Sequence, residues 1–139
     1  MQTIHEIQKE IIEDFKIFDD WTQKYEYLID LGKTLTPIKS KYKTDANLIK
    51  GCQSRVWLNA EIVNNNIIFY ADSDAIMTKG IIALLIKVLS GQNANNIANA
   101  NLDFINQIGL KEQLSATRAN GLVSMIKQMK LYALALNKK

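Results

Sequence analysis

The chain has 139 residues, of which 47% are hydrophobic, and carries a formal net charge of +3. This length and composition, with a single proline and no Gly/Ser-rich linker, predict one globular domain spanning residues 1–139. The small charge, spread along the chain, argues against nucleic-acid binding, and no apolar run is long enough to cross a bilayer. With a single cysteine and no signal-peptide pattern, we expect a cytoplasmic protein without a disulfide or membrane contact.

Two amphipathic helices are predicted near the N-terminus. The first follows a capping-box pattern that starts at Thr3, and its apolar residues recur at three- and four-residue spacing. The second begins after Asp20, which is suited to an N-cap, and Gly32 is expected to end it. The stretch 33–47 has no clear periodicity, so we predict a loop there.

An antiparallel hairpin is predicted in the middle of the chain. Apolar and polar residues alternate over 56–62, three asparagines at 64–66 suit a tight turn, and 67–70 returns as the partner strand. The aliphatic face of the first strand, as far as Ile62, is expected to pack on helices. Trp57 on the opposite face is expected to be half-buried.

The rest of the chain is predicted to be mostly helical. The segment Asp72–Ser73 is expected to cap a central helix, which is apolar nearly all round and extends to Gly91. Residues 92–101 are rich in asparagine and predict a loop with at most a short helical turn. A short helix at 103–108 and a long last helix from Ser115 follow. Helices on both sides of a small antiparallel sheet define an α+β fold.

The lone cysteine, Cys52, follows Gly51 on the loop that leads into the hairpin. Cys52 and the lone His5 cannot supply the four ligands of a structural zinc site or an iron–sulfur cluster, so no metal site is expected. A Cys–His hydrolase would need an orienting acid, and a dithiol oxidoreductase would need a second cysteine. Carrying one sulfur atom, by contrast, needs only a single thiolate.

Its position in the sequence alone favours a structural role for Cys52, that of a small buried hydrophobic residue. The residues around Cys52 indicate a reactive thiol instead. The motif G-C-Q-S-x-V-W at 51–57 resembles the signature of the SufE-type cysteine desulfuration proteins. Further stretches resemble that family in order and spacing, with Ala71 where many members have glycine: W-x-x-K-Y-x-Y-L-I-x-L-G at 21–32, D-S-D-A-x-x-x-K-G at 72–80 and L-x-x-T-R-x-x-G-L at 114–122.

The resemblance implies a SufE/IscU-like fold and a carrier that accepts persulfide sulfur on Cys52 from a SufS-like cysteine desulfurase. It further implies that the protein stimulates the desulfurase and passes sulfur to iron–sulfur cluster assembly on a SufBCD-like scaffold. The pyridoxal phosphate (PLP) belongs to the desulfurase, so this chain is expected to have no cofactor and not to be a stand-alone enzyme. Gly51, Gln53, Asp74 and Arg118 are the expected partner-interface residues.

Alternatives remain open at this level: a carrier for another sulfur-using pathway, or an allosteric activator of the desulfurase that never carries sulfur. A cluster scaffold would need two chains to share ligands. We expect Lys50, Arg55 or Arg118 to lower the pKa of Cys52 modestly, because a larger thiolate fraction is offset by weaker nucleophilicity. Asp74 is expected in the first turn of the central helix, where its charge suits the dipole.

Overall fold

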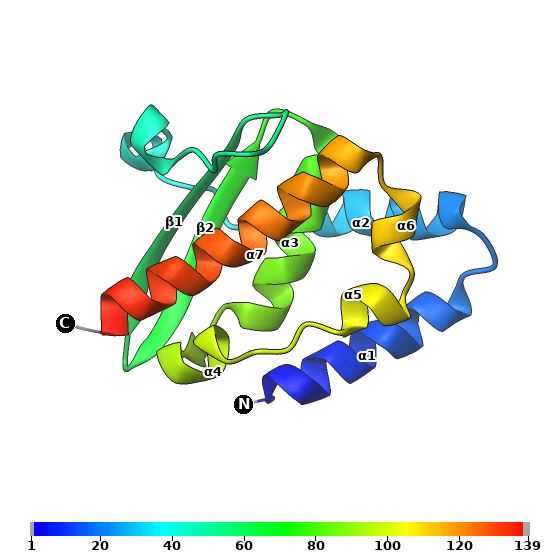
Figure 1. Ribbon diagram of the computed structural model, residues 1–139, viewed down its shortest axis with the longest axis horizontal. Coiled ribbons are helices and arrows are strands. Elements are labelled where there is room, and N and C mark those ends of the chain that lie inside the picture. The colour runs from blue at the N-terminus through cyan, green and yellow to red at the C-terminus, as the bar shows by residue number, and fades with distance from the viewer. Residues whose placement is uncertain (1, 138–139) are drawn as a thin grey trace.

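The computed structural model describes residues 2–137 and has an α+β fold, as the sequence predicts (Figure 1). Its sheet is antiparallel, with strand order β1-β2-β3. The elements in chain order are α1 (Ile4–Ile17), α2 (Trp21–Lys33), η1 (Ser40–Tyr42), η2 (Asp45–Asn47), β1 (Val56–Val63), β2 (Asn66–Ser73), α3 (Ile76–Leu89), β3 (Gln92–Asn93), α4 (Ala94–Ala98), α5 (Phe104–Gln107), α6 (Leu110–Gln113) and α7 (Ala116–Asn137). None of the helices in the described part of the chain is long and apolar enough to span a membrane.

The local signals that start the two N-terminal helices are confirmed. The Thr3 hydroxyl accepts a hydrogen bond from the Glu6 amide at 3.1 Å, and the Glu6 carboxylate accepts one from the Thr3 amide at 3.0 Å. The Asp20 carboxylate accepts a hydrogen bond from the Gln23 amide at 2.9 Å and caps α2. Each cap satisfies backbone donors that the first turn of a helix leaves free.

The prediction that Gly32 ends α2 is wrong. The helix continues to Lys33, and Thr34 is its C-cap. A Cβ atom at Gly32 would stand 3.0 Å from the backbone nitrogen of Gly80 in α3, and one at Gly80 would collide with the Leu28 carbonyl. These two glycines therefore let α2 and α3 pack backbone to backbone, a tertiary requirement that local sequence does not reveal.

The hairpin forms as predicted, but its second strand is longer. Asn64 and Asn65 have φ values of 52° and 68°, the left-handed backbone of a two-residue hairpin turn. Pairing with β1 continues to Ser73, which lies opposite Val56. The expected cap at Asp72–Ser73 is therefore wrong, because both residues belong to the sheet and α3 begins only after Ala75.

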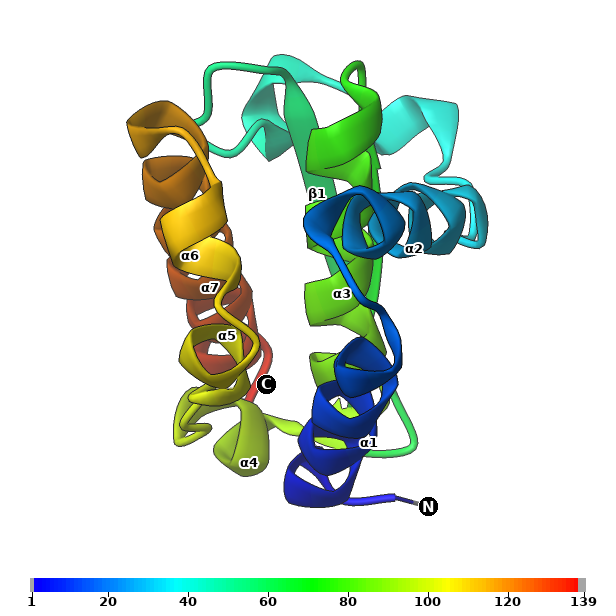
Figure 2. The ribbon, with the colours of Figure 1, turned by 90° about the vertical axis from the view of Figure 1, so that its right-hand side faces the viewer.

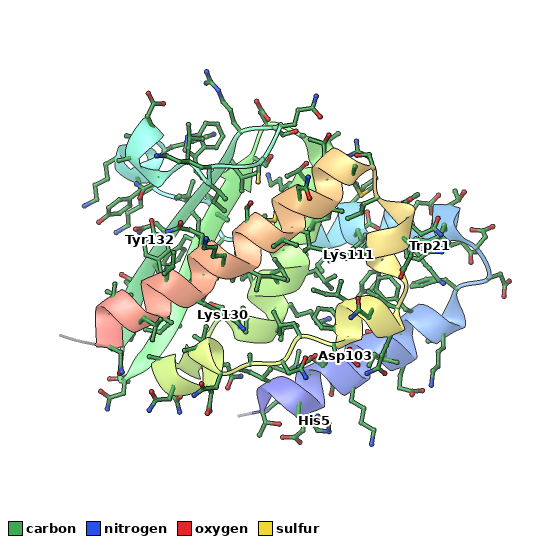
Figure 3. The ribbon with its side chains drawn as sticks, in the orientation of Figure 1. His5, Trp21, Asp103, Lys111, Lys130 and Tyr132 are labelled. Carbon is green, nitrogen blue, oxygen red and sulfur yellow. The ribbon has the colours of Figure 1, made fainter. Side chains whose placement is uncertain are left out.

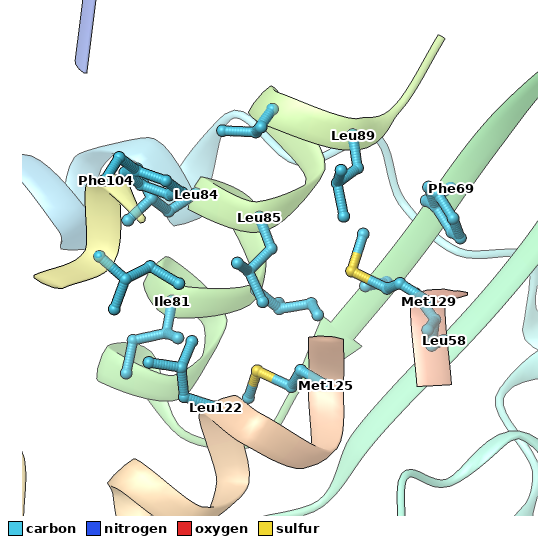
Figure 4. Packing of buried hydrophobic residues seen from close by; sticks show 14 of the residues in the cluster. Leu58, Phe69, Ile81, Leu84, Leu85, Leu89, Phe104, Leu122, Met125 and Met129 are labelled. Atoms are coloured by element: carbon cyan, nitrogen blue, oxygen red, sulfur yellow. The ribbon is translucent and has the colours of Figure 1, made fainter. Parts of the chain in front are cut away.

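The helices form layers around the sheet and α3. Figure 2 shows α4 to α7 on one side, β1 and α3 in the middle, and α1 and α2 on the other side. The core joins the sheet, α3 and α7 (Figure 4), through buried residues that include Leu58, Phe69, Leu85, Met125 and Met129. Met125 and Met129 are four residues apart on α7, so both lie on the face of the helix that packs inward.

The stretch 33–47, a loop with two short 3₁₀ turns, packs against β1 and covers the outer face of the sheet at Trp57. Trp57 is consequently only 8% exposed, more buried than expected. At the far end of β1 the opposite holds, since Ile62 is 44% exposed although it continues the aliphatic face. The sequence period gives the two faces of a strand, but it does not tell how far each face is covered.

The segment 92–113 is more ordered than predicted. Gln92 and Asn93 add a short third strand beside β2, and the side chain of Asn93 then caps α4 by accepting a hydrogen bond from the Asn96 amide at 2.8 Å. Ile97 is fully buried. The predicted helix at 103–108 is found as α5, and α6 is an additional turn. Asparagine suits both loops and helix N-caps, and Asn93 takes the second role here.

Candidate functional site

The cysteine loop, residues 50–55, is closed at its base by backbone pairing. The Ile49 amide donates a hydrogen bond to the Val56 carbonyl at 2.9 Å, and Leu48 forms an antiparallel bridge with Trp57. Gly51 has a φ of +94°, a conformation that residues with a side chain rarely adopt. The loop therefore turns sharply just before Cys52 and leads directly into β1.

The end of the cysteine loop is fastened to the segment after β2. The Arg55 amide donates to the Asp74 carboxylate at 3.1 Å, and the Asp74 amide donates to the Arg55 carbonyl at 3.3 Å. The Ser73 hydroxyl donates to the same carbonyl at 2.7 Å. Asp74 is exposed. The prediction that it lies in the first turn of the central helix is wrong, because α3 begins only at Ile76. Its carboxylate holds the loop backbone instead.

The other side of the loop rests on the first turns of α7. The Cys52 thiol donates a long hydrogen bond to the Gly121 carbonyl, with Sγ and O 3.7 Å apart. A Cβ atom at Gly121 would lie 3.3 Å from that sulfur, and one at Gly51 would lie 2.5 Å from the Ser124 hydroxyl oxygen. Glycines on both sides thus let the loop and the helix touch.

A small cavity of about 70 Å³ opens beside the thiol. The loop contributes Cys52 and Gln53, α3 contributes Thr78 and Ile81, and α7 contributes Arg118 and Met125. Among the described residues that line the cavity there is no carboxylate or imidazole. The cavity leaves room for a small group next to the sulfur, has Arg118 in its wall, and offers no general base.

Cys52 is half-buried, and burial raises the pKa of its thiol above the ordinary value. The modest lowering expected from nearby cations is therefore not found in this conformation. Desolvation disfavours the thiolate, and the long hydrogen bond from the thiol also favours the neutral form. At rest the site holds a protonated, sheltered thiol.

The predicted site residues do not all gather at one point. Gln53 and Arg118 line the cavity with Cys52, Gly51 shapes the loop, and Asp74 acts through Arg55. Arg118 is exposed near the start of α7, and it forms no ion pair with any described residue.

Sequence reasoning did not single out the contact of Gly121 with the sulfur or the place of Thr78 in the cavity. Gly121 does stand in the last of the family-like stretches, which is the only signal that could have found it. His5 lies on α1 and points outward, and the described residues contain no group of three or more potential metal ligands (Figure 3).

Comparison with known proteins agrees with the fold and the motifs. The model of the SufE family, described as an Fe-S metabolism associated domain, matches residues 9–133. A solved structure of a hypothetical protein from Thermus thermophilus superimposes with a TM-score of 0.81 at 17% identity, covering 96% of this chain and 97% of the other, and so shares the fold.

Several relatives whose names state a family or a role are similar to this protein over most of its length. SufE-like protein 1 of Arabidopsis thaliana, chloroplastic/mitochondrial, is 41% identical over all of this chain, which spans only 38% of that longer protein. The sulfur acceptor protein CsdE of Escherichia coli is 36% identical, over 78% of this chain and 75% of CsdE. The cysteine desulfuration protein SufE of Wigglesworthia glossinidia brevipalpis is 32% identical, over 90% and 88%. The matched domain and these relatives together show that the chain belongs to the SufE family.

Proposed function

We propose that this protein is a sulfur carrier that accepts persulfide sulfur on Cys52 from a cysteine desulfurase. The observation that carries the proposal is the cavity beside the only thiol of the chain, closed by three stretches far apart in sequence. The names of the E. coli and Wigglesworthia relatives, a sulfur acceptor and a cysteine desulfuration protein, support the same interpretation.

The transfer is a thiol–persulfide exchange. The Cys52 thiolate attacks the terminal sulfur of the donor cysteine persulfide, a new S–S bond forms, and the old S–S bond breaks with the donor thiolate as leaving group. One sulfur atom moves, no external oxidant or reductant is consumed, and the proton lost by Cys52 is balanced by the proton that the donor thiolate takes up. A second cysteine in the chain would discharge the persulfide as a disulfide, so a lone cysteine suits a carrier.

The resting geometry suits storage better than attack. The raised pKa keeps Cys52 protonated, and the cavity lining offers no base to remove the proton. We infer that the thiol ionises when the docked desulfurase draws the loop out of its shelter, or when a group of the desulfurase takes the proton. The same shelter would afterwards keep small thiols away from the terminal sulfur of the persulfide.

The partners belong to the same proposal. The donor is a SufS-like desulfurase, which brings the pyridoxal phosphate and is stimulated when its sulfur is removed, and the acceptor is a SufBCD-like scaffold for iron–sulfur clusters. Gln53 and Arg118 line the cavity, where we expect a partner to dock, Gly51 shapes the turn before Cys52, and Asp74 fastens the end of the loop through Arg55. A different downstream sulfur pathway is the alternative for the second step.

The test is intact mass spectrometry after incubation with the desulfurase, its pyridoxal phosphate and cysteine. The parent protein should gain one sulfur atom that a reductant removes, and Cys52→Ser should gain none. Desulfurase turnover should rise with the parent protein and stay basal with Cys52→Ser. Equal stimulation by both proteins would instead establish an allosteric activator that carries no sulfur.

A further inference from the structure

Asp72, near the end of β2, lies at the centre of an ion-pair cluster. Its carboxylate is 2.8 Å from the Lys43 ammonium and 3.3 Å from the Lys79 ammonium, and it accepts a hydrogen bond from the Ser73 amide at 2.8 Å. The side chain of Asp72 is 23% exposed, less than either lysine at 40% and 38%. This carboxylate is therefore shared by two cations and partly removed from water.

The cluster joins three segments: the stretch before the cysteine loop, the end of β2 and the start of α3. Lys43 comes from the stretch that leads into the cysteine loop, and its ammonium also lies 4.8 Å from the centre of the Trp57 ring. Trp57 is directly opposite Asp72 in the hairpin, and Trp57 also bridges to Leu48 in the incoming stretch. Lys79 comes from the first turns of α3. The incoming stretch is thus fixed to β1 and β2 by charge, by an aromatic face and by backbone pairing.

The same segments carry the walls of the thiol cavity. Lys79 directly follows Thr78, which lines the cavity, and Asp72 is two residues before Asp74, which holds the Arg55 amide. The base of the loop closes at Ile49, six residues after Lys43. Movement of the incoming stretch away from Asp72 would therefore open the base of the loop and the shelter of Cys52.

We propose that Asp72, Lys43 and Lys79 form a positioning cluster that keeps the cysteine loop closed over its cavity. Asp72 has the central part, because among the described residues it pairs with two lysines from different segments, Lys43 before the loop and Lys79 in α3. Without its charge the two ammonium groups face each other unpaired and repel. The significance of the cluster for sulfur transfer rests on the proposed carrier function, but its effect on the loop can be measured without a desulfurase.

The test uses Asp72→Asn, which keeps the shape of the side chain and removes its charge. Alkylation of Cys52 by iodoacetamide at fixed pH should become about three- to tenfold faster, because the loop opens more often. Hydrogen exchange should accelerate in residues 43–55 and remain unchanged in α1 and α5. Lys43→Gln should act in the same direction, whereas Lys43→Arg, which keeps the charge and a flat face for Trp57, should stay close to the parent.

The matched control is Glu13→Gln, which removes the acidic partner of Lys16 in an exposed ion pair on α1. It should leave the alkylation rate at the parent value. An unchanged rate in Asp72→Asn would overturn the proposal, and so would faster exchange throughout the chain, which would make Asp72 a general stabilising residue. A parent protein that gains no sulfur from the desulfurase would refute the carrier function, while the alkylation result would still decide whether the cluster holds the loop.

Discussion

At the scale of single residues, the chemistry of Cys52 is set by its surroundings more than by its sequence neighbours. Lys50 and Arg55 are close in sequence but exposed, and the thiol instead faces the Gly121 carbonyl and a cavity whose lining includes Thr78, Ile81 and Met125. Burial therefore outweighs the cations and the pKa of Cys52 is raised. A carrier gains from this arrangement, because a neutral and sheltered sulfur reacts slowly with adventitious electrophiles.

The first prediction concerns the pH dependence of Cys52. Since burial raises its pKa, the alkylation rate of the native protein should rise with pH at a midpoint above that of the same chain unfolded in urea. Because the pKa of Cys52 is higher in the folded than in the unfolded protein, the protonated thiol contributes to the free energy of unfolding. This contribution is complete below the pKa of the unfolded chain and should be lost as pH rises through the pKa of the folded protein. Cys52→Ser should lack this loss. A native midpoint at or below the unfolded one would mean that the thiol is activated at rest.

The second prediction concerns Arg118. It is exposed, unpaired among the described residues and placed against the dipole at the start of α7, so Arg118→Ala should not lower the thermal midpoint. If the guanidinium meets a desulfurase carboxylate in a buried contact, the loss should be about 2–5 kcal/mol in binding, and at least tenfold in affinity or transfer rate. Arg118→Lys should be impaired less, because lysine keeps the charge without the planar fork. Binding and single-turnover transfer measure both effects.

Lys111→Ala, which removes an exposed cation on α6, is the control for a change in overall charge. It should bind the desulfurase like the parent protein. A loss under threefold in Arg118→Ala would make this arginine an ordinary surface residue. A large fall in its thermal midpoint would give it a structural role instead.

At the scale of elements, the central feature is the close packing of α2 on α3. The two helices meet at Gly32 and Gly80, where the backbone of each helix leaves no room for a side chain on the other. This contact positions the first turns of α3, which provide Thr78 for the cavity and Lys79 for the cluster at Asp72. The glycines in the two family-like stretches thus support the site although they do not touch it.

The third prediction follows from this contact. Gly80→Ala should lower the free energy of unfolding by about 1–3 kcal/mol, since a Cβ there would collide with the Leu28 carbonyl in a packed interface. In an open helix the same change would raise stability by about 1 kcal/mol. Urea unfolding measures the difference. The control is Ala135→Gly at an exposed position of α7, which measures the difference in helix propensity between the two residues without a packing contact. A Gly80→Ala protein that is more stable than the parent would contradict the close packing.

At the scale of the whole molecule, segments far apart in sequence meet at one end. The cysteine loop, the first turns of α3 and the first turns of α7 surround the thiol at this end (Figure 1). The core between the sheet, α3 and α7 extends from there (Figure 4). The described residues there include one sulfur ligand and no cluster of metal-binding side chains. One thiolate is enough to carry one sulfur atom, whereas a cluster needs about four thiolate ligands.

The fourth prediction tests that interpretation. After anaerobic incubation with iron and sulfide, followed by desalting, the protein should retain no stoichiometric iron and no visible cluster absorption, because a cluster needs about four thiolate ligands. Cys52→Ser serves as the control for adventitious iron. A stable cluster with one half equivalent per chain, absent from Cys52→Ser, would instead indicate two chains that share their cysteines.

The sequence by itself determined the features that depend on neighbours along the chain. The capping box at Thr3, the cap at Asp20 and the turn at Asn64 and Asn65 all formed as predicted, because a cap or a tight turn closes its hydrogen bonds within a few residues. The family-like stretch around Cys52 likewise identified the family from the chain alone.

The tertiary structure decided everything that depends on what a segment packs against. Gly32 is locally typical of a helix end and Asp72 of a cap, yet one lies in a helix contact and the other in a paired strand beside two lysines. The pKa of Cys52 rises because α7, which begins more than sixty residues later, covers the thiol. Burial and charge act through space, so their balance at a residue is fixed only when distant segments have been brought together.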